Sequence, residues 1–217
     1  MTSVTIVVPV YNQADDLAAR LVRLADYFAP YRTAYGISFV IVDDGSTNDT
    51  LLACRRFAQY RRNVTIIPLD RHRGIGHALR TAFRHVAAEY TIVLDGALSF
   101  GPNAALELLE ALERTGADIA LASPYMAGAY AAPTSYVRDR WHRLLNRALS
   151  LLARARYATF TCVVRAYRTA SLRTLAFSDD SYRAIPELLF SAIHARKAII
   201  EIPVRIEWTS EYSVLAH

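Results

Sequence analysis

The first half of the chain alternates short, continuous apolar runs with segments whose apolar residues recur at helical spacing. The apolar runs are residues 4–10, 37–43, 64–68, 91–95 and 118–123. Because each run is continuous rather than alternating, we expect strands that are buried on both faces. Helical spacing follows the first run and recurs after Asp49, Gly76 and Pro102. This β-α-β-α order predicts an α/β fold with a doubly wound, mainly parallel sheet.

The pattern changes after Ser123. Residues 124–135 are rich in Pro, Gly, Ala and Tyr and predict a loop that folds over a cleft. Strands are expected at 161–167 and 199–206, with a helix over 186–194 between them. Another helix is expected over residues 136–156. Its inward face would carry the apolar residues Trp141, Leu144, Leu145, Ala148 and Leu152. No repeat or linker interrupts the pattern, so we expect one domain over residues 1–217.

Composition narrows the class of protein. With 217 residues, 53% of them hydrophobic, the chain can bury a core of its own, which excludes a disordered protein and a disulfide-stapled miniprotein. Its two cysteines, Cys54 and Cys162, lie far apart and outside any metal-ligand spacing, so they argue against a structural zinc site and for a reducing compartment. No stretch reaches about 18 consecutive apolar residues, so we expect a soluble cytoplasmic protein without a spanning helix.

The positive charge is concentrated in one segment. The chain carries a net charge of +5, and Arg supplies all but one of its 25 basic residues. Between Arg138 and Arg156 lie six arginines against the single acid Asp139, a surplus equal to that of the whole chain. Such a segment suits nucleic acid, an anionic membrane surface or a phosphorylated substrate. It can equally be an ordinary surface helix whose arginines are solvated. Nucleic acid is the least favoured, because no stacking aromatics alternate with the arginines and no nucleic-acid motif occurs.

Polar residues gather where three of the predicted strands end. These exits read VPVYNQ (8–13), VDDGS (42–46) and LDGALS (94–99). In an open parallel sheet, ligands bind beyond the carboxyl ends of the strands. Tyr11 can line or stack on a base, and the carboxylates of Asp43 and Asp44 can accept hydrogen bonds from a base or a ribose hydroxyl. We therefore expect a nucleotide here, although both acids are also suited to a turn that starts the next helix.

A glycine-rich turn follows the third predicted strand. Gly74 and Gly76 fit a strand-to-helix turn that cradles a phosphate, and Arg73 beside them suits a diphosphate. Two plainer interpretations stay open. The glycines can simply permit tight packing, and the nearby Arg71, His72, Arg73 and His77 can be solvated surface charges.

The order and spacing of these motifs resemble glycosyltransferase family 2, and within it the polyprenyl- or dolichyl-phosphate sugar synthases. The matching segments are VVPVYN (7–12), VDDGST (42–47), RGIGHALRTAFRH (73–85), LDGALSF (94–100), GADIALAS (116–123), CVVRAYR (162–168), PELL (186–189) and IEIPV (200–204). The resemblance implies a GT-A-like mixed sheet that binds a nucleoside diphosphate sugar. It also implies a nucleotide-binding half over residues 1–123 and an acceptor-side half over 124–217. Among the nucleotide-binding residues it places Pro9, Tyr11, Gln13, Asp43, Asp44, Arg73 and Gly74.

The family usually holds a divalent metal on a DxD motif at the fourth strand exit, and this chain departs from that motif. Asp95 matches the first Asp, but Ala97 occupies the second position and Ser99 a further polar one. By resemblance, Asp95 is the catalytic and metal-binding carboxylate. Mg²⁺ and Mn²⁺ favour several oxygen ligands, so we expect weak or absent metal binding. Gln13, Ile75, Pro124 and Thr159 also replace residues that are frequent in the family.

The resemblance also gives expectations about the acceptor. It places Arg138, His142 and Arg165 at an acceptor phosphate, although Arg165 would equally suit a structural ion pair. The expected reaction moves a sugar from a nucleoside diphosphate sugar to a polyprenyl phosphate or another phosphorylated or lipid-linked acceptor, with peripheral contact at the inner membrane face. The alternative is a catalytically inactive relative that binds a nucleotide or a protein partner.

Overall fold

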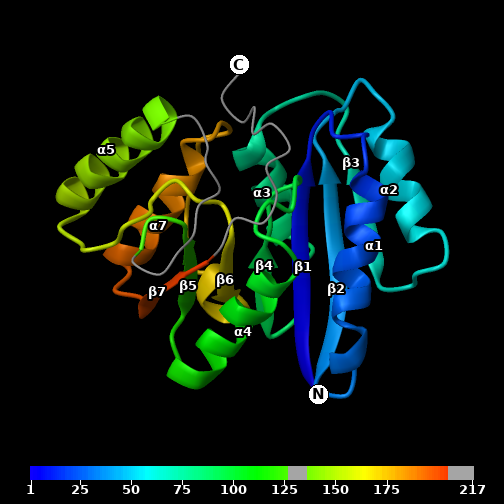
Figure 1. Ribbon diagram of the computed structural model, residues 1–217, viewed down its shortest axis with the longest axis horizontal. Coiled ribbons are helices and arrows are strands. Elements are labelled where there is room, and N and C mark those ends of the chain that lie inside the picture. Colours follow the sequence, from blue (N-terminus) through cyan, green and yellow to red (C-terminus); the bar gives the residue numbers. More distant parts are fainter. Residues whose placement is uncertain (127–135, 205–217) are drawn as a thin grey trace.

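The computed structural model describes residues 1–126 and 136–204, without the side chains of residues 136–139 (Figure 1). Within these ranges, one sheet runs in the order β3-β2-β1-β4-β6-β5-β7. Its strands are β1 (Thr2–Val10), β2 (Tyr35–Asp43), β3 (Val64–Pro68), β4 (Tyr90–Val93), β5 (Ile119–Ser123), β6 (Arg165–Arg168) and β7 (Ile199–Pro203). β6 is antiparallel to both of its neighbours, and the other pairs are parallel. The predicted mainly parallel, mixed α/β sheet is confirmed.

Four of the five continuous apolar runs form buried strands, as predicted. The third run, β3, is an edge strand whose residues are half-buried or exposed, so the expected burial on both faces is wrong there. Residues 4–10 of β1 and 39–43 of β2 are buried throughout, and all of β4 and β5 are buried. Two predicted strand bounds are wrong. β4 ends at Val93, so Asp95 lies two residues beyond the strand, and β6 begins at Arg165 rather than at residue 161. The end predicted for the last strand, residue 206, lies outside the described residues.

Helices connect these strands and cover the sheet. They are α1 (Leu17–Tyr27), the 3-10 turn η1 (Ala29–Tyr31), α2 (Thr50–Ala58), α3 (Ile75–Phe83), α4 (Asn103–Thr115), α6 (Thr169–Leu172) and α7 (Ala184–His194). α1 packs on α2, α3 packs on β1 and β2, and α4 packs on β4, β5 and β6 (Figure 1). Since α3 also contacts α7, the glycine-rich turn before α3 lies near a segment about a hundred residues further along the chain.

α5 (Tyr136–Ala153) lies at the edge of the molecule beside α7 and far from α2 (Figure 1). The prediction that its apolar face packs inward is wrong. Trp141, Leu144 and Leu145 are 68%, 60% and 48% exposed, Leu152 is 75% exposed, and Ala148 is exposed as well. The buried side instead carries Asn146, which is 2% exposed, with Leu149 and Ala153 against the core. Residues 127–135 of the predicted loop, and Trp208, lie outside the described residues.

The two halves expected from the sequence share this one sheet. β6 comes from the second half, yet it lies between β4 and β5 of the first half. β7, also from the second half, extends the sheet beside β5. β4, which leads to Asp95, and β5 are therefore held in part by hydrogen bonds to the acceptor-side half.

Candidate functional site

The ends of β1 and β2 are joined by hydrogen bonds at the predicted ligand edge of the sheet. Val10 pairs with Asp43, and the Asp44 amide donates to the Val10 carbonyl at 2.9 Å. Asn12, in the left-handed region with φ 49°, donates its amide to Ser46 Oγ at 2.9 Å. Its Oδ1 accepts from the Thr47 amide at 2.9 Å. Asn12 and Ser46 were missed as site residues, although the polar residue after Tyr11 was a signal that could have identified Asn12.

Asp43 is buried at the end of β2 and faces its own loop. It is 2% exposed, and its Oδ1 accepts hydrogen bonds from the amide and the hydroxyl of Ser46. The Ser46 hydroxyl in turn accepts from the Asn12 amide. This chain of bonds fixes the loop after β2 against the loop after β1. The turn role that the sequence left open is therefore real, and nucleotide contact by Asp43 stays a prediction.

Asp44 ties the end of β2 to the glycine-rich turn. Its carboxylate accepts from the amides of Arg73 at 3.0 Å and Gly74 at 2.7 Å, and its Oδ2 lies 2.9 Å from Nδ1 of His72. The His72 ring stacks on Tyr11, with centroids 3.9 Å apart and planes at 22°. Thus Tyr11 already has an aromatic neighbour, and four predicted nucleotide residues (Tyr11, Asp44, Arg73 and Gly74) meet in one cluster.

The glycine-rich turn is closely covered by the loop before α7, residues 178–183. Gly74 has φ 105°, and a Cβ on Gly76 would lie 2.1 Å from the Asp179 carbonyl oxygen. The Gly76 amide donates to the Asp180 carbonyl at 2.8 Å. The close-packing interpretation of the two glycines is therefore correct. Unpaired amides at a helix N-terminus favour an anion. Here the Asp180 carbonyl accepts from two of these amides, those of Gly76 and His77.

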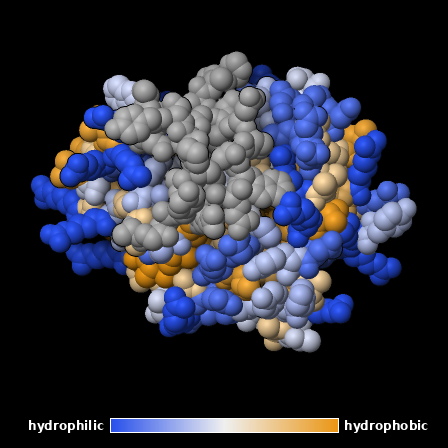
Figure 2. All heavy atoms as spheres, in the orientation of Figure 1, coloured by the Kyte–Doolittle hydropathy of each residue, from blue (hydrophilic) through white to orange (hydrophobic). Residues whose placement is uncertain are grey.

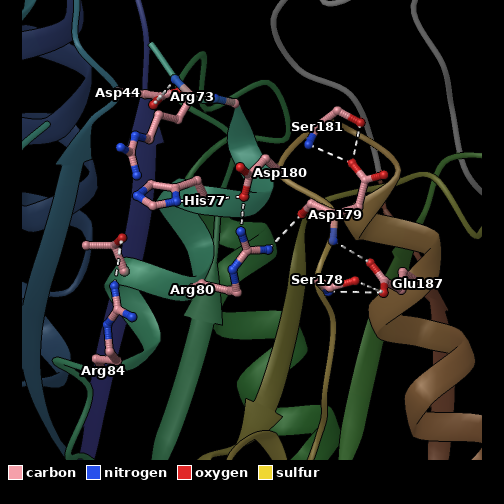
Figure 3. Close-up of polar contacts among 12 residues, drawn as sticks. Asp44, Arg73, His77, Arg80, Arg84, Ser178, Asp179, Asp180, Ser181 and Glu187 are labelled. Atoms are coloured by element: carbon pink, nitrogen blue, oxygen red, sulfur yellow. Dashed lines mark hydrogen bonds and ion pairs between the residues drawn. The ribbon is translucent and has the colours of Figure 1, made fainter. Parts of the chain in front are cut away.

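Charged side chains strengthen this contact between α3 and the loop (Figure 3). Arg80 forms an ion pair with Asp180 and donates to the Asp179 carbonyl at 2.8 Å. His77 Nδ1 lies 3.7 Å from the Asp180 carboxylate. Burial, followed by the positive charges of Arg73 and Arg80, nevertheless lowers the pKa of His77. At neutral pH His77 is therefore an uncharged imidazole in the first turn of α3.

Glu187, in the first turn of α7, holds the other side of the same loop. Its carboxylate accepts from the Ser178 amide and hydroxyl at 3.0 and 3.1 Å and from the Asp179 amide at 3.0 Å (Figure 3). The segment 178–183 is thus fixed at both ends, by α3 and by α7.

The exits of β1 and β4 meet at Gly96. A Cβ on Gly96 would lie 2.3 Å from Oε1 of Gln13 and 2.8 Å from the Pro9 carbonyl oxygen. Oε1 of Gln13 is buried and has no hydrogen-bond partner within residues 1–126 and 136–204, so it remains an acceptor beside the Asp95 turn. The structure accordingly brings Pro9 and Gln13 next to Asp95, which connects the first and fourth exits.

Asp95 is held by its own turn. It is 8% exposed, and its carboxylate accepts from the Ser99 amide at 3.0 Å and the Ser99 hydroxyl at 2.6 Å. In the described residues no three His, Cys, Asp or Glu side chains form a group that could hold a metal ion. With Ala97 in place of a second carboxylate, the residues present do not make a complete site for Mg²⁺ or Mn²⁺.

Of the predicted acceptor residues, Arg165 is enclosed by the protein. Arg165 is 1% exposed, and its guanidinium donates to the carbonyls of Ile185 at 2.9 Å and Phe160 at 2.7 Å. It is therefore a buried cross-link, which argues against both the predicted phosphate contact and an ion pair with an acid. His142 is half-buried on α5. The side chain of Arg138 lies outside the described residues.

Neither cysteine is suited to nucleophilic chemistry. Burial raises the pKa of both Cys54 and Cys162 to about 12, so both are protonated thiols at neutral pH. After burial, the nearby charge of Asp95 also raises the pKa of Cys162.

The sequence model of the family described as glycosyl transferase family 2 matches residues 5–176. The chain belongs to this family. An undecaprenyl-phosphate 4-deoxy-4-formamido-L-arabinose transferase from Edwardsiella ictaluri is 30% identical over 205 residues, 93% of this chain and 59% of that protein. A protein of the same name from Pseudomonas fluorescens is 27% identical, over 98% of this chain and 60% of its own length. The chain thus spans about three fifths of these relatives.

Solved structures share the fold. Glucosyl-3-phosphoglycerate synthase from Mycobacterium tuberculosis, in complex with Mn²⁺, UDP and glucosyl-3-phosphoglycerate, superposes with a TM-score of 0.71 at 15% identity, over 94% of this chain and 71% of that one. S. aureus TarS 1-349 gives a TM-score of 0.62 at 18% identity, over 94% and 59% of the two chains. At these identities the likeness establishes the GT-A fold. It does not carry over a ligand.

Proposed function

We propose that this chain is the catalytic domain of a glycosyltransferase that moves a sugar from a nucleoside diphosphate sugar to a polyprenyl phosphate or a related lipid-linked phosphate. The observation that carries the proposal is the meeting of three strand exits, with Asp43, Asp44 and Asp95 at one edge of a parallel sheet. That edge is where such sheets bind nucleotides. The named relatives, which act on undecaprenyl phosphate according to their names, support the choice of acceptor.

The donor would lie across the exits of β1, β2 and β4. Tyr11, stacked on His72, offers a flat aromatic surface to a base. Asp43 and Asp44 shape the loops around it, and Gln13 Oε1 supplies a buried acceptor that has no partner in the described part of the chain. Arg73 is exposed beside the glycine-rich turn, where its guanidinium can reach a diphosphate oxygen.

The acceptor would enter from the side of α5. A phosphate is already anionic, so its oxygen can attack the anomeric carbon without a strong general base. The new bond forms in line as the bond to the nucleotide diphosphate breaks, and the configuration at the anomeric carbon inverts. His142 and Arg138 on α5 are the proposed phosphate contacts, and Arg165 is left out because it is buried. Peripheral contact with the cytoplasmic face of a membrane follows from this choice of acceptor.

Asp95 is the only carboxylate that the DxD-like segment offers to a divalent ion. An ion bound there would offset the charge that grows on the leaving diphosphate. Because the protein site is incomplete, we expect Mn²⁺ to bind weakly alone and more tightly when UDP is present. Calorimetric titration of Mn²⁺ with and without UDP measures this difference. Tight Mn²⁺ binding by the protein alone would show that the ligand set extends beyond Asp95.

The reaction is tested by incubating the protein with labelled nucleoside diphosphate sugars and undecaprenyl phosphate. Transfer should produce a labelled lipid and should fall by about a hundredfold or more in Asp95→Asn, the magnitude seen when a charge-stabilising group is lost. Asp26→Asn is the matched control, since Asp26 is exposed at the far end of α1. Equal transfer by Asp95→Asn and wild type would remove Asp95 from the catalytic site.

A second candidate is an inactive relative that keeps nucleotide binding. Two observations favour it: Ala97 at the second DxD position, and the occupation of the α3 N-terminus by the Asp180 carbonyl. A thermal-shift screen with nucleoside diphosphates separates the two functions, because a ligand of the native state raises Tm whether or not sugar is transferred. A shift with UDP but no labelled product for any sugar would support the inactive relative.

A further inference from the structure

Large hydrophobic side chains are exposed mainly on α5. Of the eight such side chains that stand out among the described residues, five belong to this helix. They are Trp141 (68% exposed), Leu144 (60%), Leu145 (48%), Leu151 (78%) and Leu152 (75%). Exposed apolar residues scattered singly need no explanation, but a contiguous apolar face marks an interaction site.

These residues share one side of the helix, and arginines flank them. At 3.6 residues per turn, Trp141, Leu144, Leu145, Ala148 and Leu152 fall on one face. Arg140, Arg143 and Arg147 fall beside that face, and Arg154 and Arg156 follow the helix. All five arginines are exposed, and residues 140–156 contain no Asp or Glu. In Figure 2, hydrophobic and strongly hydrophilic spheres lie side by side at the edge where Figure 1 places α5.

The helix is held with this face outward. Asn146 Oδ1 accepts from the amides of Phe160 at 2.6 Å and Thr161 at 3.2 Å, and its Nδ2 donates to the His142 carbonyl at 2.8 Å. Rotating the helix to bury its leucines would leave these buried amides without partners, at a cost that exceeds an ordinary hydrogen bond. The hydrogen bonds of Asn146 therefore fix the orientation of α5 in which its apolar face is exposed.

We propose that α5 docks on an anionic lipid bilayer, with its apolar face in the acyl-chain boundary and its arginines among the headgroup phosphates. A helix with an apolar face, flanking arginines and a Trp is typical of an in-plane interfacial helix. The lack of acids over residues 140–156 favours an anionic surface over a neutral protein partner. This inference rests on the proposed function, because a lipid-linked phosphate acceptor lies in a membrane and the enzyme has to bind there to reach it.

The buried side of α5 leads directly toward the site. Asn146 holds the segment at Phe160 and Thr161, and the Phe160 carbonyl accepts from the buried Arg165. Arg165 pairs with Val93, the last residue of β4. The buried side of α5 is thus linked through residues 160–165 to the end of β4, two residues before Asp95.

Flotation of the whole chain with vesicles tests the docking. Binding should be strong with equal parts phosphatidylcholine and phosphatidylglycerol, weak with phosphatidylcholine alone, and should fall with added salt. Replacing Arg147, Arg154 and Arg156 with Gln should reduce partitioning about fivefold for each arginine, near a hundredfold in all. The matched control replaces Arg55, Arg56 and Arg62, which are exposed on and after α2 at the opposite edge, and should leave binding unchanged within about twofold.

The apolar contact has its own variant and readout. Leu144→Ser with Leu151→Ser and Leu152→Ser should reduce binding more than about tenfold, whereas Leu52→Ser with Tyr60→Ser, exposed on and after α2, should not. With Trp208 replaced by Phe, Trp141 is the only tryptophan. Brominated lipids should then quench its fluorescence. Binding without quenching would overturn the insertion and leave only charge attraction.

Other occupants of this face give different results. If a second copy covers it, sedimentation will show a dimer in solution that the Leu→Ser variant dissociates, and vesicles will not compete. If neutral and anionic vesicles bind equally, or neither binds, the docking is wrong. Transfer to a short, water-soluble isoprenyl phosphate separates this outcome from the proposed function. The α5 variants should still transfer sugar to the soluble acceptor but should no longer transfer it to an acceptor embedded in vesicles. If the wild-type protein binds vesicles but transfers sugar to neither acceptor, the proposed reaction is wrong and the docking stands.

Discussion

The carboxylates at the strand ends already have hydrogen-bond partners inside the protein. Asp43 and Asp44 are 2% and 3% exposed. Asp43 accepts from an amide of its own loop, and Asp44 accepts from two amides of the glycine-rich turn. Their first physical effect is to fix loop positions, so that any ligand meets a prearranged surface. A substitution at Asp44 should therefore change both stability and nucleotide affinity.

Asp44→Ala should lower the free energy of unfolding by about 1–3 kcal/mol, because the amides of Arg73 and Gly74 lose their acceptor. The affinity for UDP should also fall, because the substitution removes the contact between Asp44 and His72, the residue that stacks on Tyr11. Urea unfolding and calorimetry measure the two effects. Asp49→Ala is the control on the same loop. Asp49 is exposed and makes no capping bond, so its loss should cost under about 0.5 kcal/mol. Equal effects of the two substitutions would contradict the anchoring role.

The missing acid at position 97 can be restored. Ala97→Asp places a second carboxylate two residues from Asp95, as Mg²⁺ and Mn²⁺ prefer. We expect Mn²⁺ affinity in the presence of UDP to rise about tenfold or more. Ala97→Asn, which matches the size without the charge, should give a smaller gain. No change in either variant would mean that this turn does not face the diphosphate.

At the scale of elements, the N-terminus of α3 depends on the loop at residues 178–183. Gly76→Ala would ordinarily favour a helix by about 1 kcal/mol. Here its Cβ would meet the Asp179 carbonyl oxygen at 2.1 Å, so the variant should instead destabilise the fold and displace the loop. Gly36→Ala is the matched control, because its Cβ would meet only the flexible end of Met1, at 3.0 Å. Tm should fall for Gly76→Ala and hold for Gly36→Ala.

The contact between α3 and the loop at residues 178–183 predicts that the free energy of unfolding depends on pH. The pKa of His77 in the folded chain lies below the ordinary value of about 6.5, through burial and the charges of Arg73 and Arg80. The unfolded state therefore binds more protons between these two values. Stability should fall as the pH drops below about 6.5, until the folded pKa is passed. In His77→Gln, the decrease in stability that comes from protonation of His77 in the unfolded state should be absent. Urea unfolding over a pH series compares the two, and parallel curves would refute the assignment.

The elements differ in how far sequence predicts them. Strands β1 to β5 were predictable within two residues at either end. For β1, β2, β4 and β5 the reason is that a strand buried on both faces must be continuously apolar, whereas β3 is a partly exposed edge strand. The orientation of α5 was not predictable, because burial of the apolar face is the usual rule and here the buried Asn146 overrides it. The contact of Asp180 with the α3 N-terminus was also hidden, since it joins residues about a hundred positions apart.

At the scale of the whole molecule, the sheet makes one body of the two predicted halves. β6 lies between β4 and β5. Thr91 of β4 and Thr169, which follows β6, also share a buried hydrogen bond of 2.8 Å between their hydroxyl oxygens. Removing the second half would leave β4 and β5 each with an open edge inside the core. Unpaired backbone groups in a buried place are costly, so the nucleotide-binding half depends on the acceptor-side half for its own fold.

Residues 1–123 alone should consequently fail to fold, although they contain β1 to β5 and most of the predicted nucleotide residues. Their amide NMR spectrum should show little dispersion and no response to UDP. Adding the fragment 124–217 should restore dispersion, because β6 can then pair with both neighbours. In the whole chain, the amides of β1 and β6 should exchange with the same opening free energy, as expected when one cooperative unit unfolds. A folded, UDP-binding fragment 1–123, or a β6 that opens well before β1, would show that the halves are separable and that the acceptor side is an addition to a complete nucleotide domain.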